Sequence, residues 1–253
     1  MKNVLLQGKD LCKTFSQGDS PVTVLDHINV DILEGDFTVI MGASGAGKST
    51  LLYALSGMDS ITSGEVLYRG MAISGLSEKE MAKLRATEFG FVFQQTNLVS
   101  NLTLLENVAV AGYVGKVRTP AEVAQRSDAL LERMGIGGAK HRLPAQASGG
   151  EAQRAALARA VINDPGLIFA DEPTGALNRA GSDEVLDLLT DLNAKGQSIL
   201  MVTHDVRSAL RGNRVLYLED GRVLDELALP PYAPADVRER EEKLNVWLSG
   251  LRW

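Results

Sequence analysis

The sequence lacks several features that mark whole classes of protein. Cys12 is its single cysteine, so an internal disulfide and a cysteine-built metal site are both excluded, and a reducing compartment is expected. The longest apolar runs, such as residues 37–41 and 199–202, have the length of strands and are far shorter than the roughly 20 residues that cross a bilayer. We therefore expect that no segment of the chain spans a membrane by itself.

Basic residues are also too few to give a cationic surface. The net charge of −6 argues against a polybasic face for nucleic acid or anionic lipid, so we expect no nucleic-acid partner. Near the N-terminus, Gly8, Lys9 and Asp10 interrupt the apolar stretch before the hydrophobic region of an export signal could form. The sequence therefore places the chain in the cytoplasm, where Cys12 is expected to be a small buried hydrophobe.

What the chain does contain is enough apolar residues for a large core. With 253 residues, 45% of them apolar, it can form one large domain or two closely packed subdomains. Apolar runs separated by turn residues predict strands at 4–7, 22–32, 37–41, 64–70, 167–170 and 198–203, and helices at 49–57, 77–88, 151–163 and 183–194. Residues 214–224 are typical of a hairpin. This alternation of strands and helices predicts an α/β fold with a mostly parallel sheet.

The pattern changes between residues 97 and 144, where turn residues give way to a helical stretch. Thr119 can cap that helix, Pro120 suits its first turn, and Glu122 completes a capping box. We expect a helical subdomain at about residues 97–150, inserted into a main domain of residues 1–229.

A glycine-rich loop follows the strand predicted at residues 37–41. It matches the pattern G-x-x-x-x-G-K-S and consists of Gly42, Ala43, Ser44, Gly45, Ala46, Gly47, Lys48, Ser49 and Thr50. Glycines let the backbone curl so that N–H groups point at phosphate oxygens, Lys48 adds a cation near the β- and γ-phosphates, and Ser49 offers a hydroxyl to Mg²⁺. Because a strand precedes the loop and a helix follows it, we interpret the loop as a triphosphate site.

Two carboxylates end the apolar run at residues 167–170. Asp171 stands where a strand tip can hold Mg²⁺ through water, and Glu172 can act as general base on a water in line with the γ-phosphate. An Asp-Glu pair alone is more often part of a solvated loop, but together with the glycine loop it indicates a magnesium site and a catalytic base.

A histidine and a glutamine end two other apolar runs. His204 follows the strand at 198–203, and parallel strands gather ligands at their carboxyl ends, so we expect His204 to share the site. Gln94 follows residues 89–93, and its amide could reach metal or water, although a glutamine alone is a weak signal. His27 and His141 are interpreted as structural.

A second glycine run follows a hundred residues after the first. It consists of Ser148, Gly149, Gly150 and Glu151 and stands at the start of a predicted helix. Alone, such a run would more often be a flexible turn with a cap. Its N–H groups and the helix dipole also favour an anion, so it could contact a nucleotide held elsewhere.

The ordered set of these motifs resembles the nucleotide-binding subunit of ATP-binding-cassette (ABC) transporters over residues 3–226. In that family the motifs are Walker A (42–49), the Q-loop glutamine (Gln94), the signature (147–151), Walker B (167–171, then Glu172) and the switch histidine (His204). The resemblance implies a P-loop ATPase core with a mostly parallel sheet, an N-terminal antiparallel β subdomain and an inserted helical subdomain. It also implies ATP as substrate and Mg²⁺ held by Ser49, Gln94 and Asp171.

The family resemblance further implies how ATP is held and hydrolysed. Phe15 occupies the place of the aromatic ring that stacks on adenine, with an ordinary core aromatic as the alternative. Glu172, His204, Gln94 and Lys48 are the expected catalytic residues. Two subunits would dimerise head to tail, and the signature of one would close over ATP held by the other.

Within the family, residues 58–65, 90–95 and 170–177 resemble one group in particular. That group includes macrolide exporters, lipoprotein-releasing complexes, FtsE-type division ATPases and antimicrobial-peptide resistance transporters. Its members partner FtsX-like or MacB-like permeases, so the chain is expected on the inner face of the cell membrane, with residues 96–104 against the permease. The transported substrate cannot be read from this chain.

The sequence departs from the family pattern at three places. The signature opens with Ala147 and ends in Glu151, and Asn178 stands where the family usually has an aspartate near the partner's Walker A. The missing charge could alter coupling between the two sites. A soluble ABC ATPase without a permease, such as a cluster-assembly ATPase, is the main alternative, and a switch that binds ATP without hydrolysis is disfavoured by Lys48, Glu172 and His204.

A tail of residues 230–253 follows the main domain. Prolines make residues 230–234 a stiff break, and a charged helix is predicted at 236–249 with its apolar side chains near one face. Packing on the protein's own surface is the favoured interpretation, and contact with a permease or membrane is the alternative.

Overall fold

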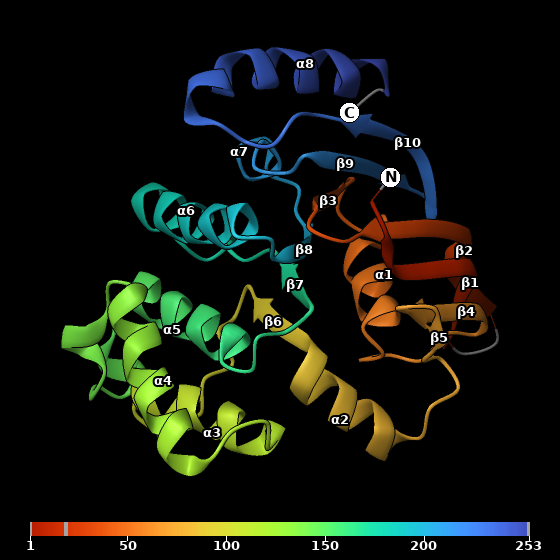
Figure 1. Cartoon of the computed structure of the whole chain (residues 1–253). Helices are drawn as coiled ribbons and strands as arrows, with labels where there is room; N and C mark the ends of the chain where they lie inside the picture. Colours follow the sequence, from red (N-terminus) through yellow and green to blue (C-terminus); the bar gives the residue numbers. More distant parts are fainter. Residues whose placement is uncertain (1, 18–19, 252–253) are drawn as a thin grey trace. The chain divides into compact units, whose positions relative to one another are not determined.

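The computed structural model (Figure 1) describes residues 2–17 and 20–251. They divide into two units, the first spanning Met1–Met81 with Asn193–Trp253 and the second spanning Ala82–Leu192. The helix α2 (Glu78–Glu88) begins in unit 1 and continues in unit 2.

An antiparallel sheet of order β2-β1-β4-β5 opens unit 1. Its strands are β1 (Val4–Gln17), β2 (Ser20–Leu33), β4 (Ser63–Tyr68) and β5 (Met71–Ala72). The strand predicted at residues 4–7 is therefore too short, because β1 continues through a polar stretch. Its pairing with β2 shifts register several times, and Asp10 and His27 adopt positive φ angles of 52° and 51°. These irregularities break the alternation that sequence patterns rely on.

The rest of unit 1 is built on four strands in the order β10-β9-β3-β8. They are β3 (Phe37–Met41), β8 (Ser198–Val202), β9 (Arg214–Glu219) and β10 (Arg222–Ala228). The buried strand β3 pairs in parallel with β8 on one side and β9 on the other. Asp220 and Gly221, with φ angles of 46° and 73°, make the two-residue turn of the predicted β9–β10 hairpin.

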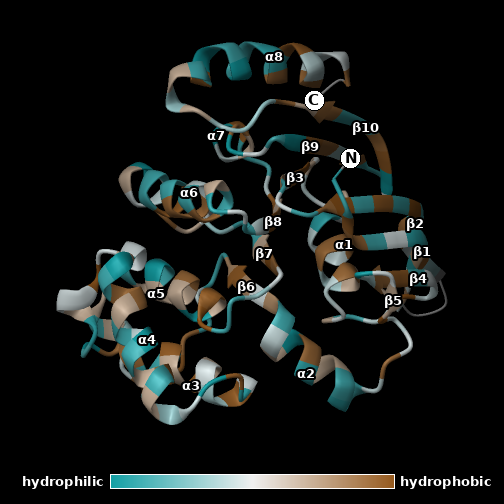
Figure 2. Cartoon of the chain, in the orientation of Figure 1, coloured by the Kyte–Doolittle hydropathy of each residue, from teal (hydrophilic) through white to brown (hydrophobic). Residues whose placement is uncertain are grey.

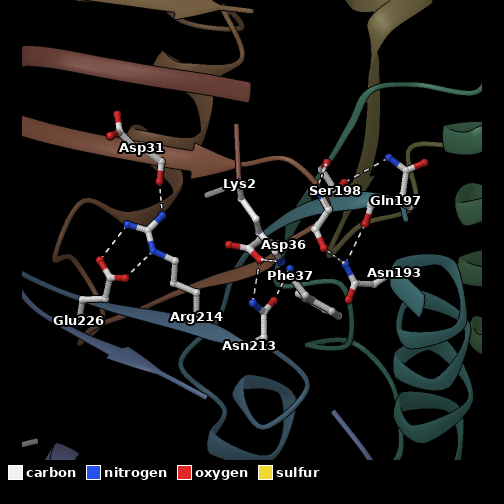
Figure 3. A network of polar contacts seen from close by, with 11 residues as sticks. Lys2, Asp31, Asp36, Phe37, Asn193, Gln197, Ser198, Asn213, Arg214 and Glu226 are labelled. Atoms are coloured by element: carbon white, nitrogen blue, oxygen red, sulfur yellow. Dashed lines mark hydrogen bonds and ion pairs between the residues drawn. The ribbon is translucent and has the colours of Figure 1, made fainter. Parts of the chain in front are cut away.

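A polar network fixes the beginning of β3 (Figure 3). The amide oxygen of Asn213 accepts a hydrogen bond from the Phe37 N–H at 2.7 Å, while its amide nitrogen donates to Asp36 Oδ1 at 2.8 Å. In the same view Arg214 donates to both carboxylate oxygens of Glu226, which ties β9 to β10. The network sets where β3 starts and therefore where the glycine loop after it lies.

Three helices complete unit 1: α1 (Lys48–Leu55), α7 (Val206–Ala209) and the tail helix α8 (Val237–Gly250), which the 3-10 turn η3 (Pro234–Asp236) precedes. The tail helix packs back on unit 1, as the favoured interpretation expects. Leu244 and Leu248 are buried, and the Trp247 indole N–H donates to Asp225 at 2.8 Å. Arg252 and Trp253 lie outside the described residues.

Unit 2 combines two parallel strands with a group of helices. The strands are β6 (Phe89–Phe93) and β7 (Leu167–Asp171), and the helices are α3 (Leu104–Gly115), α4 (Pro120–Arg133), α5 (Gly149–Val161) and α6 (Arg179–Ala194), with 3-10 turns η1 (Gly137–Ala139) and η2 (Pro144–Gln146). Both strands are coloured as hydrophobic in Figure 2. The Phe169 ring of β7 stacks on Phe91 and meets Phe89 edge to face, which fixes the register of the two strands.

Capping boxes begin three helices of unit 2. Thr119 and Glu122 form the predicted box of α4, and Ser148 and Glu151 form another at α5. Helix α3, which the sequence reasoning did not predict, starts with the same device. The chain is thus an α/β protein with an antiparallel N-terminal sheet, as predicted. Within residues 2–17 and 20–251, the helices are all too short or too polar to cross a membrane.

Candidate functional site

The glycine loop connects β3 to α1 inside unit 1, and its conformation requires glycine at two positions. A Cβ on Gly42 would lie 2.1 Å from the Leu218 carbonyl oxygen, since β9 runs directly beside the loop. Gly47 has a φ of 98°, and a Cβ there would lie 2.9 Å from the Val24 oxygen of β2. The curled loop exposes Ala43, Ser44 and Gly45 to solvent. It has the form expected of a backbone cradle for phosphates.

Lys48 begins α1 with its side chain folded back over this loop. Its Nζ donates to the carbonyl oxygens of Gly42 at 2.8 Å and Ala43 at 2.9 Å, and the residue is buried. The N-cap of α1 is Gly47, which carries no side chain to accept a backbone N–H, and the first turn of α1 has no acidic residue. The N-terminus of this helix therefore presents N–H groups and a cation to an anion, as a triphosphate site requires.

His204 lies beside the loop in the same unit. It follows β8, which pairs with β3, and the N–H of Thr203 donates to the carbonyl oxygen of Ile40, two residues before Gly42, at 3.1 Å. The side chain of His204 is exposed. Asp205 after it caps α7 by accepting the Ser208 N–H at 3.0 Å. Unit 1 thus brings the predicted loop and the predicted histidine to the carboxyl ends of neighbouring parallel strands.

Phe15 lies near the end of β1, also in unit 1. Its neighbour Thr14 pairs with Thr23 of β2, one residue before Val24, whose carbonyl oxygen faces Gly47 of the loop. The Phe15 ring is 42% exposed, which leaves it available to stack on a flat ligand. This position and exposure favour the predicted adenine platform over a core aromatic.

Unit 2 brings together Gln94, Asp171 and Glu172. Strands β6 and β7 are parallel, with Phe93 opposite Asp171, so Gln94 follows at the same end where Glu172 stands. Gly175 lies in the turn after Glu172. Its N–H donates a hydrogen bond to the carbonyl oxygen of Glu172 at 3.0 Å. A Cβ on Gly175 would lie 2.9 Å from Gln94 Nε2. Glu172 has a φ of 46°, a left-handed conformation that costs free energy in a non-glycine residue and is often found at functional sites.

The second glycine run borders an open cleft of about 540 Å³ in unit 2. Ser148, Gly149, Gly150 and Glu151 line it on one side, and Asn178 with the start of α6 lines it on the other. The Asn178 amide oxygen accepts the Gly181 N–H at 2.9 Å, so this residue caps α6. The helix predicted at residues 183–194 therefore starts four residues earlier in the structure, at Arg179, directly after this cap.

Glu151 is held within the capping box of α5. Its carboxylate accepts the Ser148 N–H at 2.7 Å, and the Ser148 hydroxyl accepts the Glu151 N–H at 3.2 Å. The hydrogen bond from the Ser148 backbone, and then that residue's hydroxyl and the nearby Arg142 and Arg154, hold the pKa of Glu151 below its ordinary value. Glu151 therefore stays ionised at neutral pH and fixes the geometry of the run.

Two residues of α5 that the sequence reasoning missed hold the chain after β6. Gln153, 1% exposed, donates to the Phe93 oxygen at 2.9 Å. Arg159 donates to the carbonyl oxygens of Thr96 and Asn97, both at 2.7 Å. A glutamine inside the alanine-rich stretch 152–160 was the available signal in the sequence. Helix α5 thus carries the second glycine run at its start and supports the segment after Gln94 further along.

The donor set suits magnesium in its chemistry. The Ser49 hydroxyl, the Gln94 amide oxygen and the Asp171 carboxylate are oxygen ligands of the kind that Mg²⁺ prefers, and Mg²⁺ usually combines one or two protein ligands with water and substrate phosphates. Asp171 is 9% exposed at the tip of β7, where a carboxylate gains from a cation.

Comparison with known proteins identifies the family. The pattern that defines the ABC transporter family matches residues 25–175. Two solved structures, each covering 90% of this chain and 100% of their own, share 37% identical residues with it at a TM-score of 0.84. One is the dimeric structure of MJ0796, a bacterial ABC transporter cassette, and the other is a dimeric post-hydrolysis state of MJ0796 bound to ADP and Pi. This chain belongs to the ABC transporter family and is an ATPase.

Proposed function

We propose that this chain is the ATP-hydrolysing subunit of an ABC transporter, that it dimerises head to tail on ATP, and that the motion drives a membrane permease of the FtsX or MacB type. The chain would lie in the cytoplasm, on the inner face of the cell membrane. The observation that carries the proposal is the presence of two different glycine-lined helix starts on one chain. Helix α1 offers a lysine and a phosphate cradle, while α5 offers an open cleft and no such lysine.

Each predicted residue has a role in this proposal that its position supports. Phe15 stacks on adenine, the loop from Gly42 to Thr50 wraps the phosphates, and Lys48 neutralises them. Ser49, Gln94 and Asp171 would hold Mg²⁺, which would supply positive charge against the phosphates of the nucleotide. Apart from Phe15, the residues of these assignments lie on the glycine loop and at the carboxyl ends of the parallel strands β3, β6 and β7.

Hydrolysis depends on two further side chains in the proposal. Glu172 accepts a proton from the attacking water, and His204 donates a hydrogen bond toward the γ-phosphate as charge develops there. Gln94 orients the water or the metal. Ser148 and the N–H groups of Gly149 and Gly150 belong to the partner's ATP site, so each site is completed only in the dimer. MJ0796 is dimeric in both of its structures, which supports this arrangement.

A groove in unit 2 supports a permease as partner. It has a volume of about 370 Å³ and is lined by apolar side chains, including Phe89, Phe91 and Val114, with Arg85 and Arg159 among the polar ones. On α3 next to it, Val110, Tyr113 and Val114 are between 42% and 63% exposed at helical spacing. An apolar groove of this kind fits the apolar face of a short amphipathic helix, as a cytoplasmic loop of a permease can provide.

A soluble ABC ATPase without a permease is the second candidate. The groove and the apolar stripe on α3 favour the permease over it, because isolated soluble proteins rarely leave a large apolar patch uncovered. Co-purification from membranes with a permease would separate the two.

The decisive experiment on the ATPase itself uses Glu172→Gln in the full-length chain. Without the base the variant should bind ATP, accumulate as a dimer by light scattering and hydrolyse on the order of a hundredfold more slowly. Glu241→Gln, which alters an exposed carboxylate on α8, is the matched control and should turn over normally. A Glu172→Gln variant that remains monomeric and fully active would refute the assignment.

A further inference from the structure

The tail helix α8 buries an arginine that the proposed mechanism does not use. Arg240 is 2% exposed, and three backbone carbonyls accept hydrogen bonds from its guanidinium. The acceptors are Leu210 at 2.9 Å from Nε, Pro230 at 2.6 Å from Nη1 and Gly212 at 2.5 Å from Nη2. The Tyr232 ring covers the guanidinium, with its centroid 5.5 Å from Cζ.

Burying the Arg240 cation costs free energy, which raises the question of what its hydrogen bonds contribute to the structure. A buried charge loses its hydration, and this desolvation lowers the pKa of Arg240 from its ordinary value. Leu244 and Leu248 show that an apolar side chain can fill this face of α8 without that penalty. What the guanidinium adds is a fixed position for three carbonyl oxygens that belong to other segments.

Two of these carbonyls, those of Leu210 and Gly212, lie within three residues after the end of helix α7, whose N-cap Asp205 directly follows His204. Asp205 caps α7 through the N–H groups of Arg207 at 3.3 Å and Ser208 at 3.0 Å, and accepts the Ser208 hydroxyl at 2.6 Å. The chain from Asp205 to Leu210 is therefore a single hydrogen-bonded turn, and His204 is the residue directly before it. Beyond it, Asn213 is tied to the start of β3 (Figure 3). Arg240 holds the carbonyls between these two fixed points.

We propose that Arg240 is a positioning residue for His204, and that the tail helix α8 thereby sets the activity of the ATP site. Through Leu210 and Gly212 the arginine fixes the end of α7, and the capped turn passes that position back to the histidine. Displacing α8 releases the turn and moves His204 out of line. The inference rests on the proposed role of His204 in hydrolysis.

The test compares Arg240→Met with Leu244→Ala in the full-length chain. Both variants weaken the docking of α8, since Met fills the space of the arginine without its hydrogen bonds and Ala leaves a cavity in the same face. Only Arg240→Met frees the Leu210 and Gly212 carbonyls. The kcat of Arg240→Met for ATP hydrolysis should fall by about tenfold to a hundredfold, because a small misplacement of a reacting group lowers the rate by that much. KM for ATP should not change, and Arg240→Lys should restore part of kcat.

Hydrogen exchange of residues 205–211 gives a readout that does not depend on turnover. In Arg240→Met these amides should exchange faster than in the wild type, while in Leu244→Ala they should keep their protection although the melting temperature falls as much or more. Wild-type kcat in Arg240→Met, or losses of kcat and protection that follow melting temperature equally in both variants, would overturn the inference.

His204→Ala separates this inference from the proposed function. If His204→Ala turns over ATP normally, the catalytic role proposed for the histidine fails, and hydrogen exchange in Arg240→Met still reports whether the arginine holds α7. If His204→Ala is inactive and Arg240→Met is as active as the wild type, the inference about Arg240 fails alone.

Discussion

The ammonium group of Lys13 lies 4.7 Å from the centre of the Phe15 ring, on one of its faces. The lysine is 7% exposed and is held there by hydrogen bonds to Asp59 Oδ1 at 2.8 Å and to the Ser60 carbonyl oxygen at 2.5 Å. Asp59 and Ser60 follow α1, the helix that starts at the phosphate loop. The cation therefore ties the Phe15 ring to the segment that follows α1, and we predict that the ring stacks on the base of the nucleotide.

Removal of the ring should weaken binding of ATP but not of triphosphate alone. Because base–aromatic stacking contributes about 1–3 kcal/mol, Phe15→Ala should raise the Kd for ATP by about fivefold to 150-fold. Lys13→Met should raise it by less, since the ring remains but loses its support. Titration calorimetry with ATP and with inorganic tripolyphosphate would show whether the two variants lose only the contribution of the base. An equal loss for both ligands would contradict the stacking role.

The glycine at the end of the phosphate loop should not tolerate a side chain. Gly47→Ala places a Cβ 2.9 Å from the Val24 oxygen at a φ of 98°, so the loop must shift and nucleotide binding should be lost. Gly35→Ala is the matched control, because its φ is 73° but a Cβ there extends into open space. That variant should lose about 1 kcal/mol of stability and bind ATP normally. Comparable Kd values for the two variants would show that the loop geometry does not matter.

The capping box of α4 should make stability depend on pH. Hydrogen bonds from Thr119, first from its hydroxyl and then from its N–H, lower the pKa of Glu122 from its ordinary value of 4.5. A group with a lowered pKa in the folded state stabilises above the unfolded-state pKa and loses that contribution as pH falls through the folded-state pKa. The melting temperature of the wild type should therefore exceed that of Glu122→Gln at pH 7 and approach it below pH 4.5.

Thr119→Ala is the control for that measurement. It keeps the acid but removes the hydroxyl, so it should lower the melting temperature at neutral pH and weaken the pH dependence that belongs to Glu122. A difference between the wild type and Glu122→Gln that stays constant from pH 7 to well below pH 4.5 would show that the charge of Glu122 is not involved.

The exposed face of α3 should be needed for membrane association and not for ATP binding. Val114→Asp puts a charge on the apolar stripe at a residue that is 63% exposed, so folding should be unaffected while the permease interface is disrupted. The fraction of the chain that sediments with membranes should fall. Val246→Asp, at a 75% exposed position on α8, should leave that fraction unchanged. Equal sedimentation of the wild type and Val114→Asp would favour the soluble ATPase.

Motifs that act locally could be predicted from the sequence. The loop from Gly42 to Ser49 is a continuous pattern between a strand and a helix, and the structure has that order. The pattern Thr119-x-x-Glu122 likewise predicted the start of α4. The same pattern stands at Thr103-x-x-Glu106, where it starts α3, and it was overlooked because turn residues dominate the stretch before it.

Features that depend on distant backbone could not be predicted. Arg240 looks like one more charge on a charged helix, and only the fold shows that the carbonyls of Leu210, Gly212 and Pro230 surround it. The support of Phe15 by Lys13 through Asp59 also depends on a loop that lies 46 residues further along the chain. No local pattern of residue types records where a carbonyl oxygen from another segment will lie.

Helix α1 differs from α3, α4 and α5 in what stabilises its first turn. Each of those three helices has a glutamate in its first turn whose carboxylate accepts a hydrogen bond from the N-cap N–H. Helix α1 instead starts at Gly47 and Lys48. Since Gly47 has no side chain that could cap α1, we predict that the phosphates of the substrate take that place. ATP binding should then order the first turn of α1: its amides would gain hydrogen-exchange protection with nucleotide, and the stabilisation against heat would grow with the logarithm of the ratio of nucleotide concentration to Kd.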